Sequence, residues 1–177
     1  MRVIAGRYGG RRLKAPPGGA TRPTADRVRE ALFSILGERV RDARVLDLFA
    51  GSGALGLEAL SRGAREVTFV EHAPAALKAL RENVAALGAD ALVERADALR
   101  WLRGASGGAR QYDLVFLDPP YRRAAELGAR LSELLPAVLA PGALVVAESD
   151  RRAPLELTIT ETDERRYGDT LIRIHAT

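Results

Sequence analysis

The sequence predicts an α/β fold, with a doubly wound and mostly parallel sheet of seven strands and helices on both faces. Three observations support this class. Short apolar runs alternate with helical patterns between residues 44 and 148, a Gly-rich turn follows the first run, and two strand-like runs without a helix between them end the chain. Such alternation is typical of βαβ units with right-handed crossovers. The 177 residues are enough for one domain of this kind.

Each element is predicted from its local pattern. Residues 1–14 mix apolar and basic residues around a Gly-Gly pair, as a short β-hairpin does. Thr24 can cap the helix that follows, which runs to about Leu36 and stops at Gly37. Five apolar runs then predict strands over residues 44–49, 66–71, 91–94, 112–117 and 143–148. Helical patterns lie over residues 53–62, 74–87, 97–103 and 122–139.

The last two runs, residues 155–162 and 169–175, alternate like strands and are joined by Tyr167-Gly168-Asp169. Strands connected this closely pair antiparallel. We therefore expect the sheet to end in a hairpin, with the final strand inserted antiparallel to the others.

Positive charge is concentrated at the N-terminus. The net charge is +4, but residues 1–22 hold six basic residues and no acid. Such an arm favours a polyanion partner such as nucleic acid, although a solvated terminus would have the same composition. We expect this basic hairpin or arm over residues 1–22 and one domain over residues 23–177. The candidate nucleic-acid contacts are Arg2, Arg7, Arg11, Arg12, Lys14 and Arg27. For Arg27 and Arg29, a solvated helix face is the default interpretation.

Several classes of protein are excluded by what the sequence lacks. Without cysteine it can form no disulfide, thiolate zinc site or thiol catalyst, and two histidines make a multi-histidine metal site a poor candidate. No apolar run approaches the length of a membrane span, and the N-terminus has no secretory apolar region. We therefore expect a cytoplasmic monomer that uses no metal and binds no membrane.

The first predicted strand leads into a Gly-rich turn at which a ligand could bind. Gly51 and Gly53 allow a tight turn and a close approach to backbone amides. Asp47, at the end of the strand, would repel a pyrophosphate and attract a cation such as an amino acid ammonium group. A tight turn without a ligand is the alternative. The candidate cofactor residues are Asp47, Phe49, Ala50, Gly51, Ser52 and Gly53.

Two further carboxylates end or follow the next strands. Glu71 ends the second strand, where a carboxylate can accept hydrogen bonds from both ribose hydroxyls. Asp97, next to Ala98, follows the third strand and could contact an adenine amine or simply cap the next helix. Together these residues suit a nucleoside that carries an amino acid, S-adenosylmethionine, better than NAD.

The fourth predicted strand ends in Asp118-Pro119-Pro120-Tyr121, which would lie beside the first loop. The prolines remove two N–H donors, which leaves the Asp118 carboxylate and the Pro119 carbonyl as acceptors. Such a pair suits a substrate with an exocyclic amine, and Tyr121 offers a face on which an extruded base can stack. Alternatively, Asp118 caps the next helix and Tyr121 packs in the core.

With these motifs the chain resembles the class I S-adenosylmethionine-dependent methyltransferases that act on exocyclic amines through an Asp/Asn-Pro-Pro-Tyr/Phe motif. Within that branch it is most similar to the bacterial 16S rRNA guanine-N2 methyltransferases, over nearly its whole length. Four stretches carry the resemblance: Arg2 to Lys14, Thr21 to Glu30, Leu46 to Ala64, and Leu117 to Tyr121. The second is the most discriminating, although Ala25 stands where the family often has a threonine.

The resemblance implies a Rossmann-like fold and methyl transfer from S-adenosylmethionine to guanine N2 in 16S rRNA of the small ribosomal subunit. It implies that Asp118, Pro119 and Tyr121 surround the guanine amine. It also implies that the segment with Arg22, Pro23 and Thr24 closes over the cofactor, although Arg22 could equally contact phosphate or Glu30. Because the chain has no separate RNA-binding domain, we expect the substrate to be a folded, protein-bearing RNA particle.

Three alternatives stay open at this point. A DNA adenine-N6 methyltransferase shares both loops, so the residues alone do not decide between guanine and adenine. A non-catalytic RNA-binding assembly factor could keep a vestigial cofactor site, although the intact motifs argue against it. A NAD-dependent oxidoreductase is a third class, against which Asp47 and the prolines count.

Overall fold

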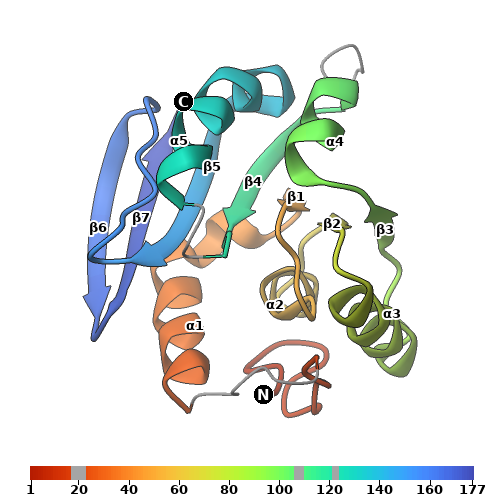
Figure 1. Cartoon of the computed structure of the whole chain (residues 1–177). Helices are drawn as coiled ribbons and strands as arrows, with labels where there is room; N and C mark the ends of the chain where they lie inside the picture. Colours follow the sequence, from red (N-terminus) through yellow and green to blue (C-terminus); the bar gives the residue numbers. More distant parts are fainter. Residues whose placement is uncertain (17–22, 106–109, 121–123) are drawn as a thin grey trace.

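Seven strands form one sheet at the centre of the molecule, in the order β3-β2-β1-β4-β5-β7-β6 (Figure 1). The structure, a computed structural model, describes residues 1–16, 23–105, 110–120 and 124–177. The strands are β1 (Arg44–Asp47), β2 (Glu66–Glu71), β3 (Leu92–Arg95), β4 (Tyr112–Leu117), β5 (Leu139–Asp150), β6 (Glu161–Tyr167) and β7 (Thr170–Ala176). β1 to β5 are parallel and β7 pairs antiparallel with β5 and β6, which confirms the predicted inserted strand.

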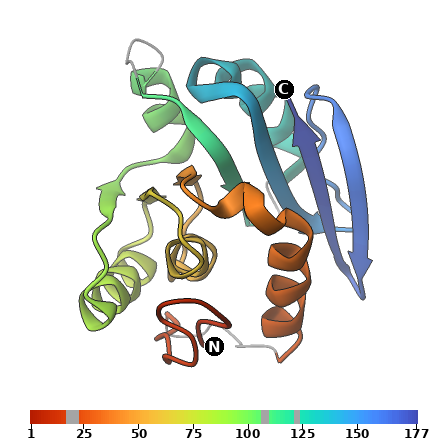
Figure 2. The same cartoon turned by 180° about the vertical axis from the view of Figure 1, so that it is seen from behind.

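Helices cover both faces of this sheet (Figures 1 and 2). They are α1 (Pro23–Leu36), α2 (Ala54–Ser61), α3 (Pro74–Leu87), α4 (Ala98–Ala105) and α5 (Ala124–Leu134), with 3₁₀ turns at Gly37–Val40 and Leu135–Val138. Buried side chains of α1, α2 and α3 pack with the N-terminal segment in one core, and those of α4 and α5 pack in a second core. The doubly wound α/β class is therefore confirmed.

The two cores follow from the alternation of side chains along the strands. In β4, Leu114 and Phe116 belong to the α1–α3 core, whereas Val115 and Leu117 belong to the α4–α5 core. All four are buried, as is typical of a parallel strand covered by helices on both faces, and this explains the unbroken apolar run. The parallel register brings the carboxyl ends of β1 to β4 to one edge of the sheet.

The strand predicted over residues 155–162 is wrong. Residues 154–160 form no strand, and the edge strand β6 begins at Glu161. Leu155 is fully buried in the α4–α5 core, and Leu157 and Ile159 pack against the same core. Their alternation therefore reflects an extended segment that packs on helices. The true edge strand carries mostly charged side chains, as exposed edges commonly do.

Two other elements are shorter than predicted. The N-terminal hairpin pairs through a single bridge, between Arg2 and Arg12. The helix expected over residues 122–139 is helical only to Leu134, because Pro136 lies in the 3₁₀ turn that follows. Across the described ranges, no helix is both long and apolar enough to cross a membrane.

Candidate active site

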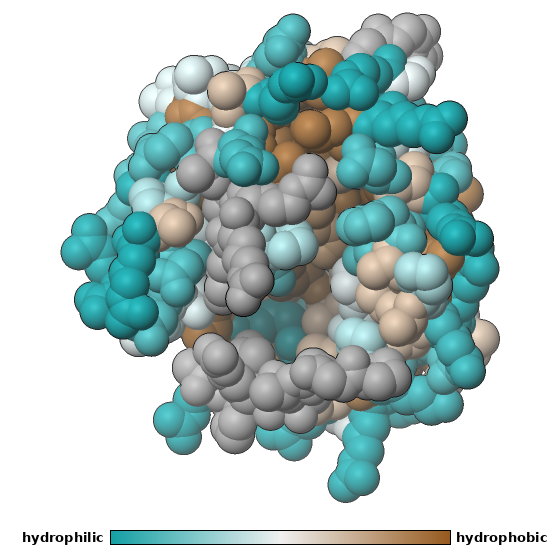
Figure 3. All heavy atoms as spheres, viewed as in Figure 1, coloured by the Kyte–Doolittle hydropathy of each residue, from teal (hydrophilic) through white to brown (hydrophobic). Residues whose placement is uncertain are grey.

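A pocket of about 400 Å³ opens at the carboxyl ends of β1 to β4. Its wall combines apolar side chains with carboxylates from the ends of three strands. Figure 3 shows this side of the molecule, which is hollowed in the middle, with hydrophobic surface along the hollow. The predicted site residues that line the pocket are Phe49, Gly51, Glu71, Asp97, Ala98, Asp118, Pro119 and Pro120.

The Gly-rich turn between β1 and α2 requires glycine at two positions. Gly51 and Gly53 have φ angles of +56° and +84°, which other residues rarely adopt. A Cβ atom on Gly53 would also lie 2.4 Å from the Leu80 side chain of α3. The predicted residues Ala50, Ser52 and Gly53 are buried, so they shape the turn, whereas Phe49 and Gly51 contribute to the pocket wall.

Asp47 lies beneath this turn. Its side chain is 1% exposed and accepts a hydrogen bond from the Gly56 N–H in α2, at 3.0 Å. Burial raises the pKa of the Asp47 carboxyl to about 7; the Gly56 N–H opposes this effect and the charge of Glu71 adds to it. In this conformation Asp47 supports the turn that a ligand would contact.

The Glu71 carboxylate is held by the backbone at the edge of the pocket. It accepts hydrogen bonds from the N–H groups of Gly51 (2.8 Å), His72 (2.8 Å) and Ala73 (2.7 Å). A carboxylate offers roughly four acceptor positions, so about one remains for a ligand. Glu71 can therefore accept a hydrogen bond from one ribose hydroxyl, whereas from the sequence we expect hydrogen bonds from both ribose hydroxyls.

Asp97 directly precedes α4 and also lines the pocket. One of its carboxylate oxygens accepts a hydrogen bond from the Arg100 N–H at 3.1 Å, so Asp97 does cap the helix. Its side chain is exposed, and no other described residue donates to the carboxylate. The capping role is therefore compatible with a contact to an adenine amine.

Asp118, Pro119 and Pro120 follow β4 at the edge of the pocket. The Asp118 side chain is exposed because it faces the pocket. The protein atoms around it, and then the charges of Glu148 and Asp47, raise its pKa well above that of an ordinary carboxyl, an effect that solvent in the open pocket weakens. Since the prolines carry no N–H, a ligand that donates N–H bonds complements this stretch.

The pocket wall suits S-adenosylmethionine better than a dinucleotide. Among the described residues that line it, the charged ones include Glu71, Asp97 and Asp118, and none is a lysine or arginine. A wall of this charge repels a pyrophosphate. Apolar side chains, among them Leu48 and Val70, offer a surface for an adenine ring.

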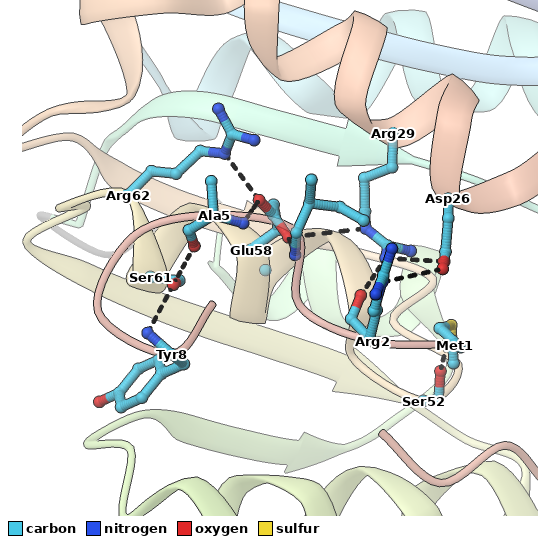
Figure 4. A network of polar contacts seen from close by, with 12 residues as sticks. Met1, Arg2, Ala5, Tyr8, Asp26, Arg29, Ser52, Glu58, Ser61 and Arg62 are labelled. Carbon is cyan, nitrogen blue, oxygen red and sulfur yellow. Dashed lines mark hydrogen bonds and ion pairs between the residues drawn. The ribbon is translucent and has the colours of Figure 1, made fainter. Parts of the chain in front are cut away.

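The N-terminal segment, residues 1–14, is docked on α2 by a network of polar contacts (Figure 4). The fully buried Glu58 carboxylate accepts hydrogen bonds from the N–H groups of Ile4 (2.6 Å) and Ala5 (3.1 Å). Ser61 Oγ donates to the Ala5 carbonyl and accepts from the Tyr8 N–H at 2.8 Å. Because the segment is held by its backbone, its charged side chains remain on the surface.

The predicted nucleic-acid contacts are all exposed, namely Arg2, Arg7, Arg11, Arg12, Lys14 and Arg27. Lys14 pairs with Glu82 of α3 (2.9 Å), but an exposed pair of this kind is weak and leaves the lysine free to exchange partners. Asn83 of α3 joins the segment to the Gly-rich turn, since it accepts from the Lys14 N–H (2.8 Å) and donates to the Ser52 carbonyl (2.9 Å).

From the sequence we expect Arg29 on a solvated helix face, and this is wrong, because Arg29 is only 4% exposed. It pairs with Asp26 (3.1 Å) and Glu58 (3.7 Å) and donates to the Arg2 carbonyl (Figure 4). Sequence reasoning misses Arg29 and Glu58 because a buried ion pair between two helices leaves no local pattern. It also misses Glu148, although that residue ends a predicted strand as Glu71 does.

Four predicted site residues make no described contact. Arg22 and Tyr121 lie outside the described residues. Pro23 and Thr24 lie in the first turn of α1, where the structure describes only the backbone. The helix begins at Pro23, so Thr24 lies inside it and is not its cap.

Comparisons with known proteins match the whole chain. A family model described as "Conserved hypothetical protein 95" matches residues 1–176. The chain is 39% identical over 185 residues to "Putative rRNA methyltransferase YlbH" of Bacillus subtilis, with 99% of this chain and 98% of that protein covered. It is 47% identical over 124 residues to "Ribosomal RNA small subunit methyltransferase D" of Escherichia coli, with 70% of this chain and 61% of that protein covered.

A solved structure described as "Putative methyltransferase yhhF from Escherichia coli" has the same fold, with a TM-score of 0.83 and 38% identity over 99% of this chain and 97% of that one. This sheet order, with a ligand pocket at the carboxyl edge, is the architecture of the class I methyltransferases, which depend on S-adenosylmethionine, and the chain is a member of that class. In particular, it belongs to the family of bacterial 16S rRNA methyltransferases, as its sequence motifs predict.

Proposed function

We propose that the chain transfers a methyl group from S-adenosylmethionine to the N2 amine of a guanine in 16S rRNA. The observation that carries this proposal is that Asp118-Pro119-Pro120 shares a pocket wall with Glu71 and Asp97. A cofactor held by Glu71 and Asp97 would lie beside the acceptors that hold the amine. The family supports the RNA substrate, because a relative is named as a methyltransferase of the small ribosomal subunit RNA.

The adenosine part of the cofactor would occupy the pocket along the ends of β1 to β3. Glu71 would accept from a ribose hydroxyl through its remaining acceptor position, and Asp97 would accept from the adenine amine. Asp47 would support the turn from beneath. The full set of proposed cofactor residues is Asp47, Phe49, Ala50, Gly51, Ser52, Gly53, Glu71, Asp97 and Ala98, with Arg22, Pro23 and Thr24 closing over them.

The chemistry requires an amine held in line with an electrophilic methyl group. When bound, S-adenosylmethionine supplies that group, and S-adenosylhomocysteine is the product once the C–S bond has broken and the N–C bond has formed. The Asp118 carboxylate and the Pro119 carbonyl would accept both amine hydrogens and so aim the nitrogen lone pair. Asp118, directly or through a water molecule, would take the proton that the nitrogen loses, and its raised pKa suits this role.

The docked N-terminal segment supports binding to RNA. It presents basic side chains on a fixed backbone beside the Gly-rich turn, where phosphates of a bound RNA could release their counterions. Arg27 would add to this surface, and Tyr121 would stack on the extruded base. We propose an assembled small subunit as the substrate and a cytoplasmic monomer as the active form.

Transfer of labelled methyl groups tests the proposal. Unmodified small subunits, naked 16S rRNA and duplex DNA are incubated with labelled S-adenosylmethionine and digested to nucleosides. We expect N2-methylguanosine, mainly from the subunits. The Asp118→Ala variant should lose at least about 100-fold in turnover, because it loses the group that orients the amine. Its affinity for S-adenosylmethionine, measured by calorimetry, should change by only a few fold.

The control variant is Asp113→Asn, at the opposite end of β4. Asp113 pairs with Arg44 at 2.8 Å on the surface, so this variant should keep normal turnover. Near-normal turnover of Asp118→Ala would contradict the mechanism. Label in N6-methyladenine from DNA would show that the substrate is adenine in DNA and not guanine in rRNA. Binding of S-adenosylmethionine without any transfer of label would favour a non-catalytic assembly factor.

A further inference from the structure

Glu148 is the acidic neighbour of Asp118 on the next strand of the sheet. β4 and β5 pair in parallel with Leu117 opposite Ala147; Glu148 continues β5, and Asp118 directly follows the end of β4. Phe116 and Val146, two residues earlier, both belong to the α1–α3 core. Because side chains alternate along β5, Glu148 lies on that face of the sheet, and its charge acts on the Asp118 carboxyl, which makes the two carboxylates neighbours.

The Glu148 carboxylate has free acceptor positions in a partly buried place. Within the described part of the chain it takes part in no hydrogen bond or ion pair, although its side chain is half-buried. Burial raises the pKa of the Glu148 carboxyl above its ordinary value, and the charge of Arg29, buried in α1, opposes this effect. A half-buried acceptor without a partner costs stability, and a ligand that donates a hydrogen bond would relieve this cost.

Two acceptors side by side match one nucleobase edge in particular. Guanine presents its N1–H and its N2 amine next to each other, and both are donors. Adenine presents an amine next to N1, which is an acceptor, so a carboxylate placed there would face a lone pair. A site built to accept a substrate N–H rejects an analogue that lacks it, because the buried acceptor of the site is then left unpaired.

We propose that Glu148 accepts the N1–H of the target guanine while Asp118 and the Pro119 carbonyl hold its N2 amine. Glu148 thereby selects guanine against adenine. This inference rests on the proposed function, because it concerns the same base at the same site.

The test replaces the target guanosine by 2-aminopurine riboside, which keeps the 2-amine but has an acceptor at N1. The guanosine is first mapped by sequencing the labelled RNA, and small subunits are then reconstituted with either base at that position. The wild-type enzyme should methylate the guanosine particle at least about tenfold more efficiently, in kcat/KM, than the 2-aminopurine particle. In the Glu148→Gln variant this preference should fall at least about fivefold, because the amide can donate to an acceptor at N1.

Glu66→Gln is the matched control, since Glu66 is an exposed carboxylate at the opposite end of β2. It should keep the wild-type preference. A wild-type enzyme without preference, or a Glu148→Gln variant with the wild-type preference, would overturn the role of Glu148. The wild-type arm does not depend on the folding of a variant. Failure of the wild-type enzyme to label guanosine in any particle would instead contradict the proposed function itself.

Discussion

At the scale of single residues, Asp47 shows how a carboxyl buried beneath the Gly-rich turn lowers the stability of the fold. The ordinary pKa of an aspartate carboxyl is 3.8, and burial raises the pKa of Asp47 to about 7 in the folded protein. The folded state therefore holds a proton that the unfolded state has lost between these two pH values. Stability is greatest below the lower value and falls as the pH rises to the upper one.

The Asp47→Asn variant should not lose stability in this way as the pH rises. The amide oxygen can still accept from the Gly56 N–H, but no charge is buried. We expect the free energy of unfolding at about pH 8, measured in urea without ligand, to rise by roughly 1–3 kcal/mol, and to change little at about pH 4. The exposed Asp97→Asn is the control and should show no such pH-dependent gain. If the Asp47→Asn variant were less stable than the wild type at the higher pH, the buried charge of Asp47 would not be the cause of the lost stability.

At the scale of elements, the N-terminal segment depends on one close approach to α2. Gly6 has a φ of +79°, and a Cβ atom there would lie 1.8 Å from the Ser61 carbonyl oxygen. Gly10 has nearly the same φ, +80°, but nothing within 4 Å of the corresponding position. Gly6→Ala should therefore undock the segment, whereas Gly10→Ala bears only the backbone cost of about 1 kcal/mol.

Hydrogen exchange measures this difference directly. The amides of Ile4 and Tyr8, which donate to Glu58 and Ser61, should exchange at least about tenfold faster in Gly6→Ala than in Gly10→Ala. Equal protection in the two variants would mean that the segment tolerates the clash by a local shift. If the docked segment binds the substrate, Gly6→Ala should also methylate RNA more slowly than Gly10→Ala does.

The elements that the sequence predicts well are those whose pattern has a single cause. β2, β4 and α3 have the predicted boundaries, because a parallel strand covered on both faces is mostly apolar and an amphipathic helix needs one apolar face. β6 was not predictable in this way, since its side chains are mostly charged and its register is set by pairing with β7. The apolar alternation just before it arises from packing on the α4–α5 core.

At the scale of the whole molecule, most of the candidate site follows from the rule that ligands bind at the carboxyl ends of parallel strands. The loops that follow β1, β2, β3 and β4 meet at one edge, so strand-end residues such as Glu71 and Asp118 fall together without any knowledge of packing. Arg29 could not be predicted, because its partner Glu58 comes from another helix and the pair forms only when α1 packs beside α2. Tertiary contacts of this kind carry no signal within a sequence window.

The distribution of charge over the molecule leads to a last prediction. The N-terminal segment packs with the α1–α3 core, whereas Arg130 is exposed on α5 in the other helical layer. If the segment contacts rRNA phosphates, Arg12→Ala should weaken binding to small subunits and reduce the slope of log affinity against log salt by about 1. Arg130→Ala removes the same charge from the opposite layer and should leave the slope unchanged. Filter binding over about 50–200 mM KCl at constant Mg²⁺ measures both slopes. Equal slopes for the two variants would show that net charge, and not this surface, attracts the RNA.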